Sequence, residues 1–218
     1  MRDRGALALV ALVAASVLCV AIDEYRTRHL GDPTYRFLTW NLILARIPLV
    51  FAALAYACAR RRFTAGVVVF GVLWLLFFPN APYLLTDFIH LQESGAAPLW
   101  YDALMLSAFA WTALLLGFVS LYLMQMIWRR AIGPGWSWVV AACALALGSF
   151  GVYIGRFMRW NSWDALLHPH GVFDVIRSEL ENPLTHPRLI GSLVVLSVAL
   201  ITGYSVLYGL VGARLELD

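Results

Sequence analysis

Six long blocks of apolar residues, separated by short polar connections, dominate the sequence. The blocks are residues 5–22, 37–58, 63–78, 99–128, 136–158 and 189–212. A transmembrane α-helix needs about 20 mostly apolar residues, so each block is long enough, or nearly long enough, to cross a bilayer. We therefore expect an all-α, polytopic membrane protein: one transmembrane domain over residues 1–218, with a bundle of six transmembrane helices and one or two short amphipathic helices at the outer face.

Composition excludes the main soluble classes of protein. Only 13% of the residues are charged and 61% are hydrophobic, whereas about a quarter of the residues in a soluble domain are charged. A soluble globular domain, a disordered chain and a nucleic-acid-binding protein are all excluded on this ground. The sequence therefore predicts that the protein lies in the lipid bilayer, which is its first expected partner.

The arginines are spread unevenly along the chain and predict its orientation. All 16 basic residues are arginines, and the triplet Arg60–Arg62 and the pair Arg129–Arg130 flank two short turns. Because positively charged loops stay in the cytoplasm, we expect both termini inside and the long polar connections outside. Arg2 and Arg4 before the first block also fit a cleavable signal peptide, which would leave five spans with the same orientation.

The stretch that follows the third block reads PNAPYLLTDFIHLQES. Pro79 is expected to end the third span, and Asn80 to cap a new helix. Polar side chains then recur at the spacing of one α-helical face, namely Tyr83, Thr86, Asp87, His90 and Ser94. The pattern predicts an amphipathic helix at the outer face. Its polar stripe either belongs to a functional site or simply meets water, and Tyr, Thr and His in place of Lys and Glu favour the site.

A second polar cluster follows the fifth block. Arg156 lies within the end of that block, and Trp160 continues its face one turn later. Asn161 and Asp164 have the spacing of a capping box, which would start a short helix. This interpretation leaves Arg156 unexplained, because a guanidinium at the end of a span must pair or reach the interface. We expect Arg156 to meet the polar stripe that begins at Tyr83.

Small residues line one face of the fifth block. Ala144, Gly148, Gly151 and Gly155 are spaced four, three and four residues apart, which keeps them on one side of a helix. Small residues of this kind let two membrane helices approach closely. The fifth helix is therefore predicted to pack tightly against a neighbour.

Arg46 is the deepest charged residue. It lies nine residues after Phe37, so about 13–14 Å into the bilayer at 1.5 Å per residue. Placing arginine there costs roughly 2.5–3.5 kcal/mol on insertion scales, so a partner inside the bundle is expected. The best candidate partners are Asp102 of the fourth block and Asp87; the alternative to a functional role is a structural buried ion pair.

A metal site is considered and not favoured. Asp87 with His90, and Asp164 with His168, have spacings that could place a carboxylate and an imidazole on one helical face for a divalent ion. Nothing fixes the distance between the two pairs, so the cofactor stays unknown. The sequence has no phosphate-binding loop, dinucleotide fingerprint, zinc-protease motif or nucleophile elbow.

Three runs resemble a known family. FFPNAPYLLTDFIHL (residues 77–91), WYDALMLSAFAWTALLLGFVSLYLMQ (100–125) and GVYIGRFMRWNSWD (151–164) are similar to the bacterial membrane family catalogued as domain of unknown function 1361. The resemblance covers roughly residues 35–210. It implies a bacterial integral membrane protein with several spans, placed in the cytoplasmic membrane, and it carries over no catalytic residue. The blocks that carry the resemblance contain both polar clusters.

These observations predict an outward-opening polar site that binds an anionic or lipid-linked head group. The candidate binding residues are Arg46, Asn80, Tyr83, Tyr101, Arg156, Arg159, Trp160, Asn161 and Asp164. An enzyme is one version of this site, with His90 as general base and Asp87 or Asp102 orienting it. The alternatives left open are a small-solute or ion transporter and a non-catalytic membrane assembly protein. The oligomeric state and the substrate are not predicted.

Overall fold

The computed structural model describes residues 2–91, 95–158 and 187–216, and those residues contain helices and no strand. In chain order the elements are α1 (Arg2–Leu30), α2 (Arg36–Arg60), α3 (Thr64–Phe77), α4 (Asn80–Tyr83), the 3-10 helix η1 (Leu84–His90), α5 (Leu99–Ile132), α6 (Pro134–Phe157) and α9 (Pro187–Glu216). Six helical stretches are long and apolar enough to cross a membrane. The predicted class, an all-α protein with six potential membrane spans, is confirmed.

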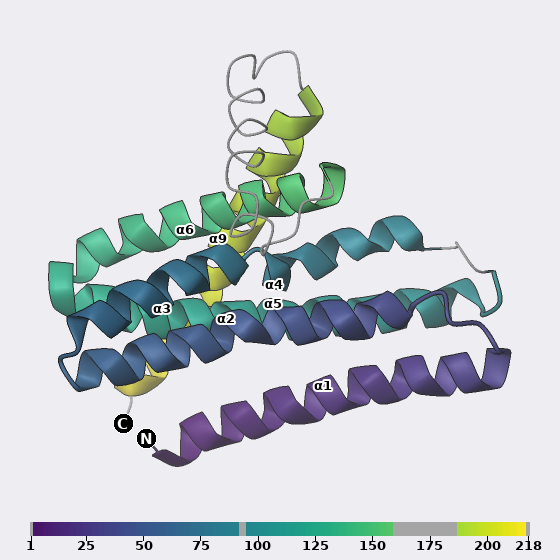
Figure 1. Cartoon of the computed structure of the whole chain (residues 1–218), viewed down its shortest axis with the longest axis horizontal. Helices are drawn as coiled ribbons and strands as arrows, with labels where there is room; N and C mark the ends of the chain where they lie inside the picture. The colour runs from purple at the N-terminus through teal and green to yellow at the C-terminus, as the bar shows by residue number, and fades with distance from the viewer. Residues whose placement is uncertain (1, 92–94, 159–186, 217–218) are drawn as a thin grey trace.

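Helix α5 lies at the centre of the bundle and is the most deeply buried of the spans. It contacts α1, α2, η1 and α6, while α2 also packs along α3. Helices α1 to α6 follow the long axis of the molecule, and α9 crosses behind them against α6 (Figure 1). The beginning of α1 and the end of α9 lie at the same end of that axis. The connection between α1 and α2 and the end of η1 lie at the other end.

Helix α1 is longer than its apolar block. The apolar block ends at Ile22, but the helix continues to Leu30. Its solvent-facing side is supported by an ion pair between Glu24 and Arg28, one turn apart at 2.7 Å. Gly31 then ends the helix with a φ of +65°, a conformation that glycine adopts without steric cost. The polar residues 23–30 are therefore arranged on helical faces and not along a loop.

The third span does not end at Pro79, which corrects the expected boundary. Phe78 and Pro79 keep helical backbone angles, and α4 and η1 follow directly. One potential span runs from Thr64 to His90. Asn80 is not a cap: its side-chain amide donates to the carbonyl of Phe77 at 2.9 Å. The polar stripe therefore lies on the continuation of the third span, in 3-10 geometry, and not on a separate amphipathic α-helix.

Glycines of two neighbouring helices hold the bend of the third span. A Cβ at Gly117 of α5 would lie 2.8 Å from the Cβ of Ala81, and one at Gly148 of α6 would lie 2.8 Å from the ring of Phe78. A Cβ at Gly151 would clash with the ring of Pro79. The prediction that small residues of the fifth block pack closely against a neighbour is confirmed, and the neighbour is the bend at Phe78 and Pro79.

The orientation of the bundle is a prediction that cysteine labelling tests. In a variant without the native cysteines, we expect cysteines introduced at Arg61 and Gly135 to resist a membrane-impermeant thiol reagent in intact cells. A cysteine at Ala96, at the other end of the bundle, should react. All three positions are exposed, so protection reports the membrane and not burial. Labelling of Gly135→Cys from outside would reverse the proposed orientation.

Candidate functional site

Two groups of polar side chains lie at the end of the bundle where α1 meets α2 and where η1 approaches α5. One group surrounds Arg26 of α1, and the other surrounds Arg156 near the end of α6. Each arginine is bound by an aspartate from a different helix. We call them the Arg26 cluster and the Arg156 cluster.

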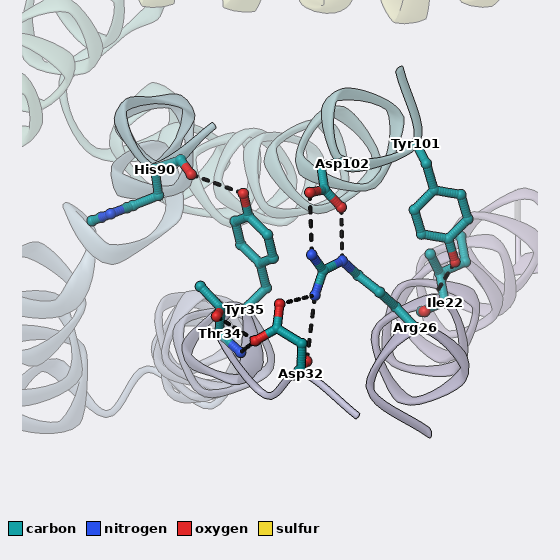
Figure 2. A network of polar contacts seen from close by, with 8 residues as sticks. All are labelled: Ile22, Arg26, Asp32, Thr34, Tyr35, His90, Tyr101 and Asp102. Atoms are coloured by element: carbon teal, nitrogen blue, oxygen red, sulfur yellow. Dashed lines mark hydrogen bonds and ion pairs between the residues drawn. The ribbon is translucent and has the colours of Figure 1, made fainter. Parts of the chain in front are cut away.

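The centre of the Arg26 cluster, the pair of Arg26 with Asp102, is closed to solvent. Nε of Arg26 donates to Oδ1 of Asp102 at 2.7 Å, and Nη2 donates to Oδ2 of the same carboxylate at 3.2 Å (Figure 2). Arg26 is 1% exposed and Asp102 is 2% exposed. This two-pronged geometry is the strongest arrangement that an arginine and a carboxylate can form, and it ties α1 to the central helix α5.

The connection between α1 and α2 completes the Arg26 cluster. Nη1 of Arg26 donates to Oδ2 of Asp32 at 3.2 Å, and its guanidinium carbon lies 4.6 Å from the centre of the Tyr35 ring. Asp32 also accepts hydrogen bonds from the backbone N–H and the hydroxyl of Thr34. Figure 2 shows the guanidinium between the two carboxylates. The short connection is thereby fixed to the bundle.

The Arg156 cluster joins α6 to η1. Nη2 of Arg156 pairs with Oδ1 of Asp87, and Nε donates to the hydroxyl of Thr86 at 2.9 Å. Its guanidinium carbon lies 4.4 Å from the centre of the Tyr83 ring. The second oxygen of Asp87 accepts from the side-chain amide of Asn41 at 3.1 Å. Helices from three parts of the sequence thus meet at one guanidinium.

His90 connects the two clusters. Its Nε2 lies 3.0 Å from Nη1 of Arg156. Because arginine can only donate, Nε2 must accept, so the proton of a neutral His90 is on Nδ1. The backbone carbonyl of His90 accepts from the hydroxyl of Tyr35 at 2.8 Å (Figure 2). Arg26 and Arg156 are thus linked through two residues, Tyr35 and His90.

The two clusters differ in access to solvent. Asp87 is 1% exposed, but the side chain of Arg156 is 11% exposed, and Tyr83, Thr86 and His90 are half-buried. In the Arg26 cluster, the side chains of Arg26 and Asp102 are buried, while that of Asp32 is 19% exposed. Of the two arginines, only Arg156 has a side chain that is partly exposed.

The predicted meeting of the stripe with the end of the fifth span is confirmed for Tyr83, Asp87 and His90, all of which contact Arg156. Tyr101 lies at the Arg26 cluster, where its hydroxyl donates to the carbonyl of Ile22 at 3.3 Å (Figure 2). Asn80 contacts the backbone of Phe77 instead of Arg156. The remaining candidates, Arg159, Trp160, Asn161 and Asp164, lie outside the described residues.

The expected partner of Arg46 is wrong. Asp102 is bound by Arg26, and Asp87 by Arg156 and Asn41. The physical reason is the length of α1: by continuing past Ile22 as a helix, it places Arg26 directly against the first turn of α5. Arg46 is half-buried within α2 and forms no ion pair with a described residue.

Arg26, Asp32, Tyr35 and Asn41 were not among the candidates from sequence. Arg26 follows the first apolar block, in a polar connection that is expected to lie outside, where a charge needs no partner. The sequence does carry a signal for it: Cys19, Asp23 and Arg26 recur at helical spacing, which places the arginine on the face of Cys19, and all three are buried. Asn41 carried a weaker signal, as a polar residue within an apolar block.

The described residues contain no group of three or more His, Cys, Asp or Glu side chains arranged to hold a metal ion. His168, part of the metal hypothesis, lies outside those residues. An open hollow lined by Ala59, Arg62, Phe63, Ile127 and Arg130, among others, lies where α2 turns into α3. It is at the opposite end of the bundle from both clusters, so it does not correspond to the expected outward-facing cavity.

Fold and site together define a polytopic α-helical membrane protein with buried arginine–aspartate pairs at one end. Residues 40–202 match the family described as "Protein of unknown function (DUF1361)". The match covers most of the chain, and the chain belongs to this family. Neither a curated protein nor a solved structure matches the chain.

Proposed function

We propose that the Arg156 cluster binds the anionic head group of a lipid or lipid-linked molecule at the outer face of a bacterial cytoplasmic membrane. The observation that carries this proposal is that Arg156 is held rigidly and still partly exposed. Thr86, Asp87, His90 and Tyr83 fix its position, while 11% of its side chain reaches the surface.

The guanidinium retains donors for a ligand. Arginine has five N–H groups in a planar fork, and its contacts with Thr86, Asp87 and His90 account for one group on each of its three nitrogens. The other two belong to Nη1 and Nη2, whose spacing matches two oxygens of a phosphate or carboxylate. Tyr83 supports one face of the plane. Asp87 positions Arg156 and neutralises its half-buried charge when the ligand is absent.

The contacts favour binding over acid–base catalysis. The lone pair on Nε2 of His90 is occupied by Arg156, so the residue is not free to take a proton from a substrate at that atom. Asp102 is bound on both oxygens by Arg26 and does not orient His90. A general-base role for His90 would need Arg156 to move away first.

A transport path for a small anionic solute is the second candidate, and Arg46 favours it. This arginine lies in the middle of α2, is half-buried and has no ion-pair partner among the described residues. Charged residues at such depth commonly mark ion or solute pathways. Under this hypothesis, Arg46 would receive the anion after the Arg156 cluster.

Lipid binding to the purified full-length protein tests the proposal. We expect phosphatidylglycerol to bind more tightly than phosphatidylcholine in native mass spectrometry, and Arg156→Gln to weaken the binding of phosphatidylglycerol about tenfold or more, since it removes hydrogen bonds to a charged group. Soluble glycerol 3-phosphate is the second probe and separates a head-group site from one that also needs acyl chains.

Arg36→Gln is the matched control, because Arg36 lies at the same end of the bundle with its side chain 62% exposed. It should change binding less than twofold. Equal losses in both variants would mean that general positive charge, and not the Arg156 cluster, attracts the lipid. The absence of any preference for anionic lipid in the wild type would also refute the proposal.

A further inference from the structure

Two buried oxygen atoms of α1 belong to neither cluster. Asp23 is 4% exposed, and its Oδ2 accepts from the hydroxyl of Thr39 of α2 at 2.9 Å. Its Oδ1 is buried and has no hydrogen-bond partner within the described part of the chain. The hydroxyl oxygen of Thr27 is likewise buried and unpartnered among those residues. Such atoms are unfavourable in an apolar interior unless something else satisfies them.

The position of these atoms defines a small polar site. Asp23 and Thr27 are four residues apart on α1, so they are neighbours on one helical face. Thr39 approaches Asp23 from α2. Asp23 and Thr39 thus meet where α1 packs on α2, and Thr27 lies one turn further along the same face of α1.

The charge around Arg26 is not balanced among the described residues. The buried carboxylates of Asp23 and Asp102 and the partly exposed carboxylate of Asp32 lie near the buried guanidinium of Arg26. Arg36 is near Asp23 but is mostly exposed and pairs with Glu24 at 3.5 Å. The buried groups thus carry more negative than positive charge, and a bound cation would offset the difference.

We propose that Asp23, Thr27 and Thr39 form a site for a small monovalent cation, either sodium or a proton, between α1 and α2. Hard cations take oxygen ligands, and this site offers carboxylate and hydroxyl oxygens. Because the site has a single carboxylate and Arg26 lies nearby, it suits a monovalent cation better than a divalent one. A proton on Oδ1 of Asp23 would offset the same charge. The protonated carboxyl group could then donate a hydrogen bond to the hydroxyl oxygen of Thr27.

Several charged or titratable groups face Asp23 and set its electrostatic surroundings. These groups are Glu24 and Arg26 of α1, Arg36 of α2 and Tyr101 of α5, while Asp102 of α5 is bound to Arg26. A cation at the site links α1 to α2. Since α1 lies at the edge of the bundle with much of its surface uncovered, occupancy should strengthen its attachment.

Thermal unfolding of the full-length protein in detergent, followed by tryptophan fluorescence, tests the sodium form. Sodium chloride is compared with N-methyl-D-glucamine chloride at equal ionic strength. We expect a saturable rise of the unfolding midpoint, about 3–6 °C at tenfold the half-saturating concentration. Asp23→Asn and Thr27→Val should abolish the rise. Glu24→Gln on the same helix, Thr64→Val at the other end and Arg156→Gln should retain it.

Infrared difference spectra between low and high pH, without sodium, test the proton form. We expect the band of a protonated carboxyl group in the wild type and in Glu24→Gln, and its loss in Asp23→Asn. The proposal is overturned if the wild type shows neither a sodium-dependent midpoint nor such a band. It is equally overturned if sodium stabilises Thr27→Val as much as the wild type. If Asp23→Asn does not fold, the wild type and Thr27→Val decide the sodium form by the midpoint, and the proton form by a change in the frequency of the carboxyl band when Thr27→Val removes its hydrogen-bond acceptor.

Discussion

Replacing Arg26 with methionine is expected to lower the free energy of unfolding by about 3–5 kcal/mol, because it leaves buried carboxylates without their counter-charge. Asp102 would lose both of its hydrogen bonds to the guanidinium, and Asp32 would lose its contact with Nη1. Methionine preserves much of the side-chain volume, so the loss reports charge more than packing. Reversible unfolding in mixed detergent micelles measures the change.

Two further variants separate the buried pair from general effects of charge. Arg28→Ala removes an exposed pair with Glu24 on the same helix and should cost less than about 1 kcal/mol. Adding Asp102→Asn to Arg26→Met removes the uncompensated carboxylate and should recover a large part of the stability. If Arg26→Met costs no more than Arg28→Ala, the Arg26 cluster does not fasten α1 to the bundle.

The number and kind of the spans could be predicted because lipid imposes a strict rule. A segment that crosses a bilayer must satisfy its backbone internally and present apolar side chains, so the apolar blocks in the sequence marked the helices. The same rule explains why small residues could be interpreted correctly. Small residues on one face of a membrane helix favour close approach of a neighbour, and both Gly148 and Gly151 meet the bend of the third span.

The ends of the helices could not be predicted in the same way. Beyond the apolar block, hydropathy no longer distinguishes a helix from a loop, so the continuation of α1 to Leu30 left little trace in composition. The helix is stabilised there by contacts with distant residues, above all the pair of Arg26 with Asp102. Such pairs depend on which helices are neighbours, which a single sequence does not state.

Only part of the pairing of charges in the candidate site could be predicted from the sequence. Arg156 was the surplus positive charge nearest the polar stripe, and charge complementarity alone indicated its contact with Asp87 and His90. Arg46 was assigned to Asp102 by the same logic, and wrongly. A nearer arginine occupies that carboxylate, since the unexpected length of α1 brings Arg26 to it. Charge complementarity identifies the partner of a residue only when every charged residue has been assigned to its helix.

Replacing Gly151 with leucine is expected to lower the free energy of unfolding by about 1–3 kcal/mol or more, through overpacking against Pro79. Even a Cβ at this position would clash with the proline ring, so α6 must shift away from the bend. Gly135→Leu is the control on the same helix, because a Cβ there meets nothing within 4 Å. Unfolding in mixed micelles should show no loss of stability in the control.

The same substitution tests whether packing at the bend positions the Arg156 cluster. Gly151 lies about one and a half turns before Arg156 on α6, so a shift that relieves the clash should also move the guanidinium away from Asp87. Arg156→Gln should then lower the free energy of unfolding by less in Gly151→Leu than in the wild type. The difference between the two losses measures the coupling between the two positions. If the two changes are additive, the guanidinium keeps its partners when α6 moves. The position of Arg156 would in that case depend on its own contacts with η1, and not on the close approach of α6 to the bend.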